Sequence, residues 1–521
     1  MKKKMQWLID AINSDSKDVL NKTLKFRISN SGKSFGTVCM PTGTGKSGVM
    51  IEDIVDYCLH RYNPGRKTVI NLSCPTLKLA EQLVTDLFET LCGVRNGNLR
   101  INSCLVLNSS DSPYNYNTYG CPVYSGDLYG AIRNASDDGY TIIIVASCHK
   151  SLQKFVPITE NLRIGADILN YIDESHLVPF KSWYFEEDGC RVDLQKLRKG
   201  SKALYLFSAT PDYAMTKEIS DSPDCEYIYK LYPFDAISEN IILPPRIRCI
   251  RCEKTIDTGL YTDLLNECKE FGGFRKVLIT MRNTEDMRIL RHRLEFCGYK
   301  VFSASAADGF TGGDGPIKDA VTFADKVDEW DGDCFVLQIK QLTQGTDIRT
   351  LTDCVIPVAN EINPKTYRTL IQTMGRVLRA APGERGMSYE SRTKKAGNIF
   401  FLLDPETDSA KELCMRRFAL RYYGMECALY GERFRMPSEM TGEIESTKHK
   451  IRDYVLDMAD SIKININMLG SSVEAEASSI LEAVDPAQYY GKRKSSSIPE
   501  YHLLDNRSLL EYAKNLIEST I

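Results

Sequence analysis

The chain has 521 residues, of which 43% are hydrophobic and 26% are charged, and its formal net charge is −3. This composition is that of an ordinary soluble globular protein, and the length favours more than one domain. No run of about 18 apolar residues occurs, which excludes a membrane-spanning helix. The near-neutral charge neither predicts nor excludes a nucleic-acid partner, because a basic groove can lie within a balanced total.

The N-terminus and the cysteines both favour a cytoplasmic protein. The chain reaches Asp10 before any apolar stretch long enough for a signal peptide. The 17 cysteines are scattered within apolar segments, as reduced, buried thiols are. Cys249 and Cys252 form a C-x-x-C pair on a predicted strand, where residues three apart face opposite sides. A zinc site completed by Cys225 and Cys268 is therefore disfavoured.

Ten short apolar runs, bounded by polar turns and separated by amphipathic stretches, predict β-strands. Their apolarity is continuous, which is typical of strands covered on both faces and hence of parallel sheets in an α/β fold. The runs lie at residues 35–40, 67–74, 140–147, 166–173, 202–209, 276–281, 299–305, 334–339, 353–359 and 398–404. After the second run, Leu79, Leu83, Val84, Leu87 and Leu91 keep helical spacing and predict an amphipathic helix.

The ten runs fall into two sets of five, which predicts two α/β domains. The segment 232–247 between the sets contains Pro233 and the pair Pro244–Pro245, which cannot continue a helix. We therefore expect one domain over residues 1–240 and a second over 241–404. No strand signal follows, so 405–521 is predicted to be a helical region with a polar tail. The stretch 92–140, rich in Asn, Ser, Gly and Tyr, is expected to be an irregular insertion in the first domain.

The segment "CMPTGTGKSGVM", residues 39–50, predicts a phosphate-binding loop. A strand runs into a Gly-rich turn and then a helix, so backbone N–H groups and the helix N-terminus converge on an anion. Gly43 and Gly45 allow the unusual dihedral angles of such a loop. Lys46 would reach the β- and γ-phosphates, and the hydroxyl of Ser47 would coordinate Mg²⁺. Met40 stands where the common P-loop spacing has a glycine.

Three further segments carry charged or hydroxyl side chains that fit such a site. In "DESH", Asp173 ends a predicted parallel strand and would hold Mg²⁺, while Glu174 would polarise the attacking water. In "LFSATP", a strand ends in the hydroxyls of Ser208 and Thr210. In "LIQTMGRVLRA", residues 370–380, two arginines three apart share one predicted helical face and could address one polyanion.

Taken in order, "PTGTGKS", "CPTLKLAEQL", "VASCHKSL", "DESH", "SAT", "KVLITMRNTEDM", "QLTQGTDI" and "QTMGRVLR" resemble motifs I, Ia, Ic, II, III, IV, V and VI of superfamily 2 helicases. The resemblance runs from about residue 35 to 404 and is closest to DExH translocases related to type III restriction subunits and phage recombination helicases. In this family motif I also replaces the early glycine, as Met40 does here. The resemblance implies two tandem RecA-like parallel-sheet domains with a helical C-terminal region.

The resemblance also implies a role for each matching residue. The ATP–Mg²⁺ site would be formed by Thr42, Gly43, Thr44, Gly45, Lys46, Ser47, Asp173 and Glu174, with nucleotide contacts from Gly345 and Asp347. The second domain would complete it through Gln372, Arg376 and Arg379, the arginines acting as fingers on the γ-phosphate. Nucleic-acid contacts would come from Pro75, Thr76, Ser147, Thr280 and Thr343, and coupling between the two sites from His176, Ser208 and Thr210.

Two departures from the family pattern bear on the substrate and the base contact. Leu77 and Lys78 replace the arginine and glutamate of the RNA-directed relatives, which favours DNA over RNA. Gln6 resembles the adenine-reading glutamine but lies far upstream of Lys46. These features predict an ATP-dependent DNA helicase or translocase.

Two alternatives remain, a duplex translocase subunit of a restriction or defence complex that does not unwind, and an ATP-switched nucleic-acid clamp. Residues 412–424 mix arginines with aromatic residues and could hold a strand, but a core helix with a basic edge is favoured. Protein partners would bind through the C-terminal region.

Overall fold

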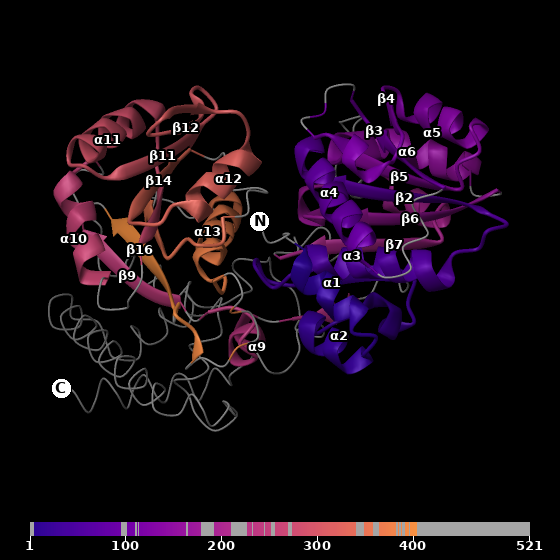
Figure 1. The fold of residues 1–521 in the computed structure, drawn as a ribbon, viewed down its shortest axis with the longest axis horizontal. Helices are drawn as coiled ribbons and strands as arrows, with labels where there is room; N and C mark the ends of the chain where they lie inside the picture. Colours follow the sequence, from indigo (N-terminus) through magenta and orange to yellow (C-terminus); the bar gives the residue numbers. More distant parts are fainter. Residues whose placement is uncertain are drawn as a thin grey trace, which may run out of the picture. The chain divides into compact units, whose positions relative to one another are not determined.

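The computed structural model forms two α/β units (Figure 1). It describes residues 5–94, 102–109, 112, 114–162, 165–178, 192–209, 227–231, 233–243, 245–251, 256–268, 274–339, 348–357, 364–381, 384, 387, 391–394 and 396–403. The chain divides between Leu231 and Tyr232, slightly before residue 240, where the sequence suggested the boundary. All ten predicted strands are present, and the prediction of two tandem α/β units built on largely parallel sheets is confirmed.

Unit 1 contains an eight-stranded, parallel sheet in the order β4-β3-β5-β2-β6-β7-β1-β8. Its strands are β1 (Phe35–Cys39), β2 (Lys67–Cys74), β3 (Ser103–Leu107), β4 (Val123–Ser125), β5 (Ile142–Cys148), β6 (Ala166–Ile172), β7 (Ala203–Ser208) and β8 (Tyr227–Lys230). Its α-helices are α1 (Gln6–Asn13), α2 (Lys17–Leu24), α3 (Lys46–Asp56), α4 (Leu77–Gly93), α5 (Leu128–Asp137), α6 (His149–Leu162) and α7 (Leu194–Lys199).

Helices cover both faces of this sheet, which is why its strands are apolar throughout. Helices α5, α6 and α7 enclose a core with the strand residues of one face, such as Val145 and Ile168. Helices α3 and α4 pack on the opposite face, and α1 packs against α4. The predicted spacing of α4 is confirmed, since Leu83, Val84 and Leu87 are buried.

The stretch 92–140 is not the irregular insertion that its composition suggested. Its described residues include β3, β4 and α5, and β3 pairs in parallel with β5 while β4 forms the sheet edge. The strand Ser103–Leu107 is fully buried although it is only five residues long. Pairing with an existing sheet edge supplies the hydrogen bonds that such a short segment cannot make by itself.

Unit 2 contains a second eight-stranded sheet, in the order β13-β12-β11-β14-β10-β15-β16-β9. Its strands are β9 (Pro245–Arg251), β10 (Lys276–Thr280), β11 (Lys300–Ser305), β12 (Gly309–Gly312), β13 (Gly315–Ile317), β14 (Cys334–Gln338), β15 (Asp353–Pro357) and β16 (Gly397–Leu403). Its helices are α9 (Pro233–Ser238), α10 (Thr258–Cys268), α11 (Thr284–Phe296), α12 (Ala320–Glu329) and α13 (Pro364–Val377). Strands β12 and β13 form an antiparallel edge, and the other pairings are parallel.

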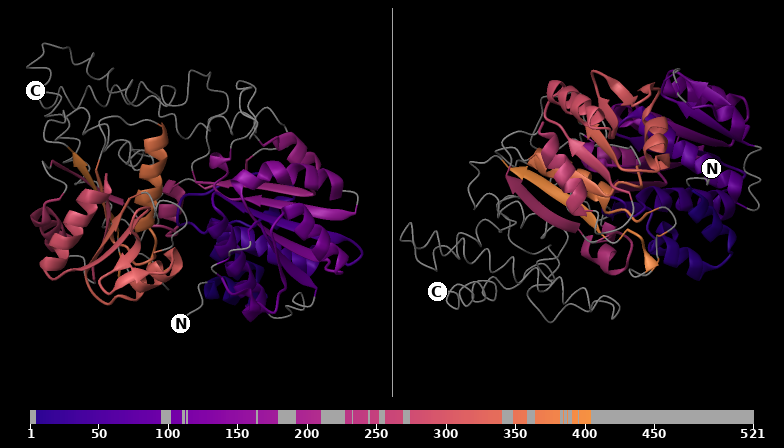
Figure 2. Two further views of the ribbon diagram at one scale, coloured as in Figure 1. Left: turned by 90° about the horizontal axis from the view of Figure 1, so that it is seen from above. Right: turned by 60° about the vertical axis from the view of Figure 1, so that its left-hand side comes forward.

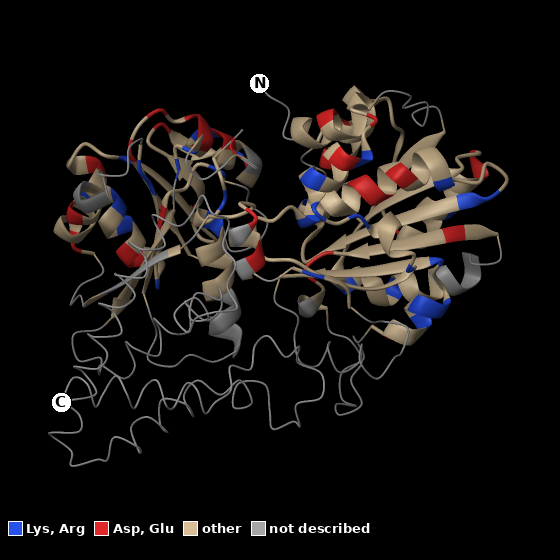
Figure 3. Ribbon diagram, turned by 90° about the horizontal axis from the view of Figure 1, so that it is seen from below, with Lys and Arg blue, Asp and Glu red and all other residues tan. Residues whose placement is uncertain are grey.

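Helices lie on either side of the strands within each unit (Figure 2). Lysine and arginine are interspersed with aspartate and glutamate over both units, in keeping with the balanced total charge (Figure 3). None of the helices in the described ranges is long and apolar enough to cross a membrane. The predicted helical region 405–521, including 412–424, lies outside the described residues.

Candidate nucleotide-binding site

The carboxyl ends of three neighbouring strands bring the predicted nucleotide-binding residues of unit 1 together. Strand β7 lies between β1, which leads into the P-loop, and β6, which leads into the acidic pair. Cys39 at the end of β1 is aligned with Ser208 at the end of β7. Parallel strands end at the same edge of a sheet, where ligands of open α/β folds bind.

The loop after β1 has the backbone conformation that a phosphate cradle needs. Gly43 (φ 88°) and Gly45 (φ 97°) both lie in the left-handed region, which a side chain would strain. Gly45 is the N-cap of α3, and the first N–H groups of a helix have no acceptor within the helix. Thr44 stiffens the turn, since its hydroxyl donates to the Pro41 carbonyl at 2.7 Å.

Lys46 is the first residue of α3 and is only 9% exposed. Its Nζ donates to the backbone carbonyl of Met40 at 3.2 Å, which folds the side chain back over the loop. Met40 itself is fully buried, and its N–H donates to the Ser208 carbonyl at 3.0 Å. Met40 therefore packs in the core, and the positive φ angles that the loop needs are supplied by Gly43 and Gly45.

The acidic pair follows β6 directly and is fixed through its backbone. The N–H of Asp173 donates to the Ser73 carbonyl at 2.9 Å, and Nε2 of His149 donates to the Asp173 carbonyl at 2.8 Å. Glu174 adopts φ 47° and ψ 44°, a left-handed conformation that is rare for a residue with a side chain. Ser175 anchors the following turn by donating to the Phe207 carbonyl at 3.0 Å. Strain of this kind is often found at functional sites.

The electrostatics of Asp173 couple it to both Glu174 and Lys46. Burial raises the pKa of the Asp173 carboxyl well above its ordinary range, the charge of Glu174 raises it further, and Lys46 opposes both effects. Its Oδ1 atom is buried with no hydrogen-bond partner among the described residues. A buried carboxylate oxygen without a donor is costly unless a cation accompanies it.

These residues fit a magnesium-bound nucleotide. The carboxylate of Asp173 and the hydroxyl of Ser47 are the hard oxygen ligands that Mg²⁺ prefers, and bound phosphates would supply others. The glycine loop and the N-terminus of α3 fit an anion. No group of three or more His, Cys, Asp or Glu side chains that could hold a metal occurs within the described part of the chain. Of the disfavoured zinc ligands, Cys225 and Cys252 lie outside that part.

The residues predicted to couple this site to nucleic acid are only partly described. Ser208 is buried at the end of β7, beside the P-loop strand. His176 belongs to a short 3-10 helix, Ser175–Leu177, directly after the acidic pair. Thr210 lies outside the described residues.

Four of the predicted nucleic-acid contacts are described, and they lie at or just after strand ends. In unit 1, Pro75 follows β2, and the exposed Thr76 caps α4 by accepting from the Leu79 N–H at 3.4 Å. Ser147, near the end of β5, is fully buried, and its hydroxyl donates to the Asn71 side chain at 2.8 Å. The Ser147 hydroxyl is therefore already engaged within the sheet.

In unit 2, Thr280 ends β10 and accepts from Nε2 of Gln338 at 3.1 Å. Thr343, Gly345 and Asp347 lie outside the described residues.

The two predicted arginine fingers do not share a helical face. Gln372 and Arg376 are buried on α13, but the helix ends at Val377. Arg379 lies beyond it in a bridge to Ile242. The helix thus stops two residues before Arg379, where backbone pairing with Ile242 replaces helical geometry.

The side chain of Arg379 is held in a desolvated setting. Its Nε and Nη1 atoms are buried, and burial lowers the pKa of Arg379 to about 10 against the opposing charge of Asp328. Nζ of Lys394 donates to the Arg379 backbone carbonyl at 2.9 Å, which fixes the chain at this point.

Two features of unit 1 were not predicted from the sequence. His149 supports the acidic pair, and its position directly after β5 was the available signal. The polar residues Glu52, Asp53 and Asp56 lie in the otherwise apolar helix α3 and are neutralised by arginines. Acidic residues within an apolar helix were the signal for this network.

Gln6, which resembles the adenine-binding glutamine of the family, lies on α1. Its Nε2 donates to Asp10 at 2.7 Å. The next residue, Trp7, packs on Gly48, so closely that an added Cβ at Gly48 would lie 2.5 Å from the indole. This contact places α1 against the first turn of α3.

No protein-family model matches the sequence, and no curated protein matches it. Solved structures are similar in fold. One is the ATP-dependent Type ISP restriction-modification enzyme LlaBIII bound to DNA, with a TM-score of 0.49 and 14% identity over 98% of this chain. This chain spans 37% of the length of that enzyme.

A second is the DEAD-box helicase Mss116 bound to ssRNA and UDP-BeF, with a TM-score of 0.48 and 14% identity, covering 93% of this chain and 91% of that one. A third is S. cerevisiae Dbp5 bound to RNA and ADP BeF3, with a TM-score of 0.44 and 16% identity, covering 80% of this chain and 89% of that one. At these identities the likeness concerns the fold.

Proposed function

We propose that the chain is an ATP-dependent nucleic-acid motor, a helicase or translocase that hydrolyses ATP at the P-loop of unit 1. The observation that carries the proposal is the convergence of Lys46 and Asp173 at one sheet edge, with Glu174 held in a left-handed conformation beside them. A phosphate cradle alone would support binding. The adjacent pair of carboxylates adds the groups needed for metal binding and for activation of water.

In this proposal each residue has a distinct task. Residues Thr42–Ser47 cradle the phosphates, with the Lys46 ammonium on the β- and γ-phosphates. Ser47 and Asp173 would hold Mg²⁺, which would neutralise charge on the phosphate oxygens. Glu174 accepts a proton from the attacking water, and its fixed backbone aims the carboxylate.

Residues of unit 2 would assist the reaction. Arg376 and Arg379 stabilise charge on the γ-phosphoryl group, and Gln372 orients the reacting groups. Both arginines are already desolvated to a large extent, so their interaction with an anion would be strong. Gly345 and Asp347 would add nucleotide contacts.

The finer assignment follows the sequence motifs. The tetrapeptide Asp173–His176 favours the DExH branch related to type III restriction subunits and phage recombination helicases. Leu77 and Lys78 favour DNA over RNA. The grip on the strand would come from contacts with the nucleic-acid backbone, made by Pro75, Thr76, Ser147, Thr280 and Thr343. Such contacts are independent of base sequence and sensitive to salt. His176, Ser208 and Thr210 would couple the two sites.

The test is ATP hydrolysis by the full chain with single-stranded DNA, duplex DNA, branched DNA and RNA in parallel. We expect stimulation by DNA that exceeds stimulation by RNA, and none in Lys46→Ala. Strand-displacement and triplex-displacement assays then separate the possible activities. A helicase separates a duplex, a translocase displaces only the triplex strand, and an ATP-switched clamp does neither. Absence of nucleic-acid-stimulated hydrolysis would contradict the motor.

A further inference from the structure

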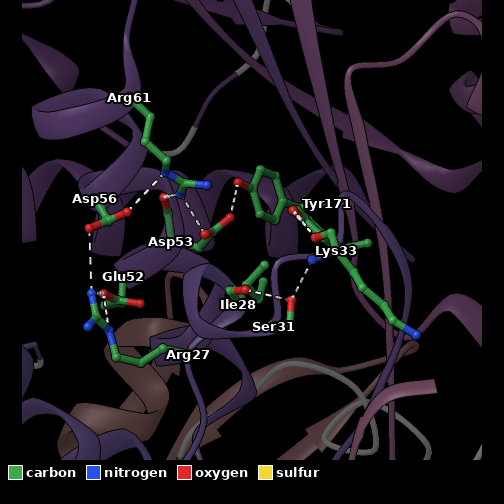
Figure 4. A network of polar contacts seen from close by, with 10 residues as sticks. Arg27, Ile28, Ser31, Lys33, Glu52, Asp53, Asp56, Arg61 and Tyr171 are labelled. Carbon is green, nitrogen blue, oxygen red and sulfur yellow. Dashed lines mark hydrogen bonds and ion pairs between the residues drawn. The ribbon is translucent and has the colours of Figure 1, made fainter. Parts of the chain in front are cut away.

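A chain of polar contacts joins α3 to β6 (Figure 4). The Tyr171 hydroxyl donates to Oδ2 of Asp53 at 2.6 Å. Oδ1 of Asp53 accepts from Nη2 of Arg61 at 2.6 Å, and the same nitrogen donates to the Asp53 backbone carbonyl at 2.8 Å. Arg61 ends a π-helical turn, Tyr57–Arg61, that continues α3. Tyrosine, aspartate and arginine thus form one continuous connection.

This connection lies on the face of α3 that carries Lys46 and on the face of β6 that continues to Asp173. Lys46 and Asp53 are seven residues apart on α3, so they lie on nearly the same helical face, about 10 Å apart along the axis. Tyr171 and Asp173 are two residues apart and continue one face of β6. The Asp53–Tyr171 hydrogen bond therefore joins the helix that begins with Lys46 to the strand that leads into Asp173.

Burial makes this connection specific. Asp53 and Tyr171 are 1% and 0% exposed, and a buried carboxylate or hydroxyl is costly without its partner. Any sliding or rotation of α3 against β6 would separate the hydroxyl from the carboxylate. A second clamp holds the neighbouring flank of α3, since Arg27 pairs with Glu52 at 2.6 Å. Two adjacent residues of α3, Glu52 and Asp53, are thus each held by a polar partner outside the helix.

We propose that the Tyr171–Asp53–Arg61 connection is a positioning device that sets the separation between the P-loop helix and the acidic pair. The inference rests on the proposed function, in which Ser47 on α3 and Asp173 after β6 hold one Mg²⁺. A shared cation needs its two ligands at a fixed distance, because Mg²⁺ demands near-ideal geometry. None of these three residues would touch the nucleotide, so they are positioning residues.

The chain offers a matched control in Tyr205 on β7. Tyr205 is the Cα partner of Tyr171 across the β6–β7 pair, and the two ring centroids lie 5.4 Å apart. It is also buried, but its hydroxyl donates to the backbone carbonyl of Lys33 at 3.1 Å, away from α3. Tyr171→Phe and Tyr205→Phe each remove one hydrogen bond made by a buried tyrosine of the same layer, and only the first releases α3.

The experiment compares the Mg²⁺ dependence of ATP hydrolysis in the full wild-type chain, Tyr171→Phe and Tyr205→Phe. For Tyr171→Phe we expect the Mg²⁺ concentration at half-maximal rate to rise about 3- to 10-fold, as loss of one hydrogen bond implies. Affinity for a fluorescent ATP analogue in EDTA should stay at the wild-type value, because the cradle remains intact. Tyr205→Phe should keep the wild-type Mg²⁺ dependence while also losing thermal stability, by less than Tyr171→Phe because its acceptor is a neutral carbonyl.

Arg61→Gln provides a second variant, because Arg61 is partly exposed and its loss should be tolerated by the fold. It loosens Asp53 from the opposite side and should shift the Mg²⁺ dependence in the same direction. The inference is overturned if Tyr171→Phe and Tyr205→Phe show the same Mg²⁺ dependence. If Tyr171→Phe does not fold, an unshifted Arg61→Gln overturns it. Failure of the proposed function gives a different result from failure of this inference. In that case the wild-type chain itself would show no Mg²⁺-dependent nucleotide binding.

Discussion

Replacement of Glu174 separates the chemistry of its carboxylate from the strain of its backbone. At φ 47° and ψ 44° a residue with a Cβ atom costs about 1–2 kcal/mol relative to glycine, which is free of this clash. At ordinary positions glycine is less stable than alanine by about 0.5–1 kcal/mol, because it loses more backbone entropy on folding. Glu174→Gly should therefore be more stable than Glu174→Ala by about 0.5–1 kcal/mol, the reverse of the usual order.

Urea unfolding followed by fluorescence measures this difference as a shift in midpoint between the two variants. Both should lack ATP hydrolysis, so the difference in stability between them does not depend on activity. Glu174→Gln keeps the side-chain shape and removes only the base. It should still bind ATP and should hold nucleic acid more tightly with ATP than the wild type does.

Two results would refute this reasoning. If Glu174→Gly is less stable than Glu174→Ala, the backbone at this position is not strained. If Glu174→Gln hydrolyses ATP at the wild-type rate, the carboxylate does not activate water. The two outcomes are independent, because one concerns the free energy of unfolding and the other the rate of a chemical step.

The other predictions concern charges in both units. Lys46→Ala should abolish ATP hydrolysis with an unchanged circular dichroism spectrum. Normal turnover would mean that the glycine-rich loop does not bind the phosphates of ATP. Arg379→Ala should lower turnover by about 10³- to 10⁵-fold, as loss of an arginine finger does, while nucleotide affinity measured by titration weakens far less. Burial, opposed by Arg27, raises the pKa of Glu52 from 4.5 to about 7. The folded state therefore binds the extra proton, so stability should fall as pH rises from about 5 to 8. In urea unfolding Glu52→Gln should flatten this decline, and an unchanged slope would exclude Glu52 as its source.

The sequence by itself determined the strands and the motifs that depend on local chemistry. The ten apolar runs all form strands, because continuous apolarity over a few residues is a local property that burial in a parallel sheet requires. Gly43 and Gly45 adopt the left-handed angles that their lack of a side chain permits. The position of Asp173 after a strand likewise followed from the run that precedes it.

Tertiary pairing overrode the local signal in two places. The polar stretch 92–140 contributes β3 and β4, since the edge of an existing sheet supplies backbone partners that composition does not reveal. The helical spacing of Arg376 and Arg379 ends at Val377, because Arg379 pairs with Ile242 from a distant part of the chain. Neither partner can be inferred from the residues beside it.

The electrostatics of the site were decided only by the tertiary structure. The residue type alone does not show whether a hydroxyl or carboxyl group is exposed to water or buried against another polar group. Burial of Ser147 against Asn71, and of Tyr171 against Asp53, depends on which strands and helices pack together. The sequence specified which residues stand at the ends of the strands. The order of the strands, β6-β7-β1, and the packing of α3 across them determined which of those residues meet, because contacts between distant segments arise only when the whole sheet has formed.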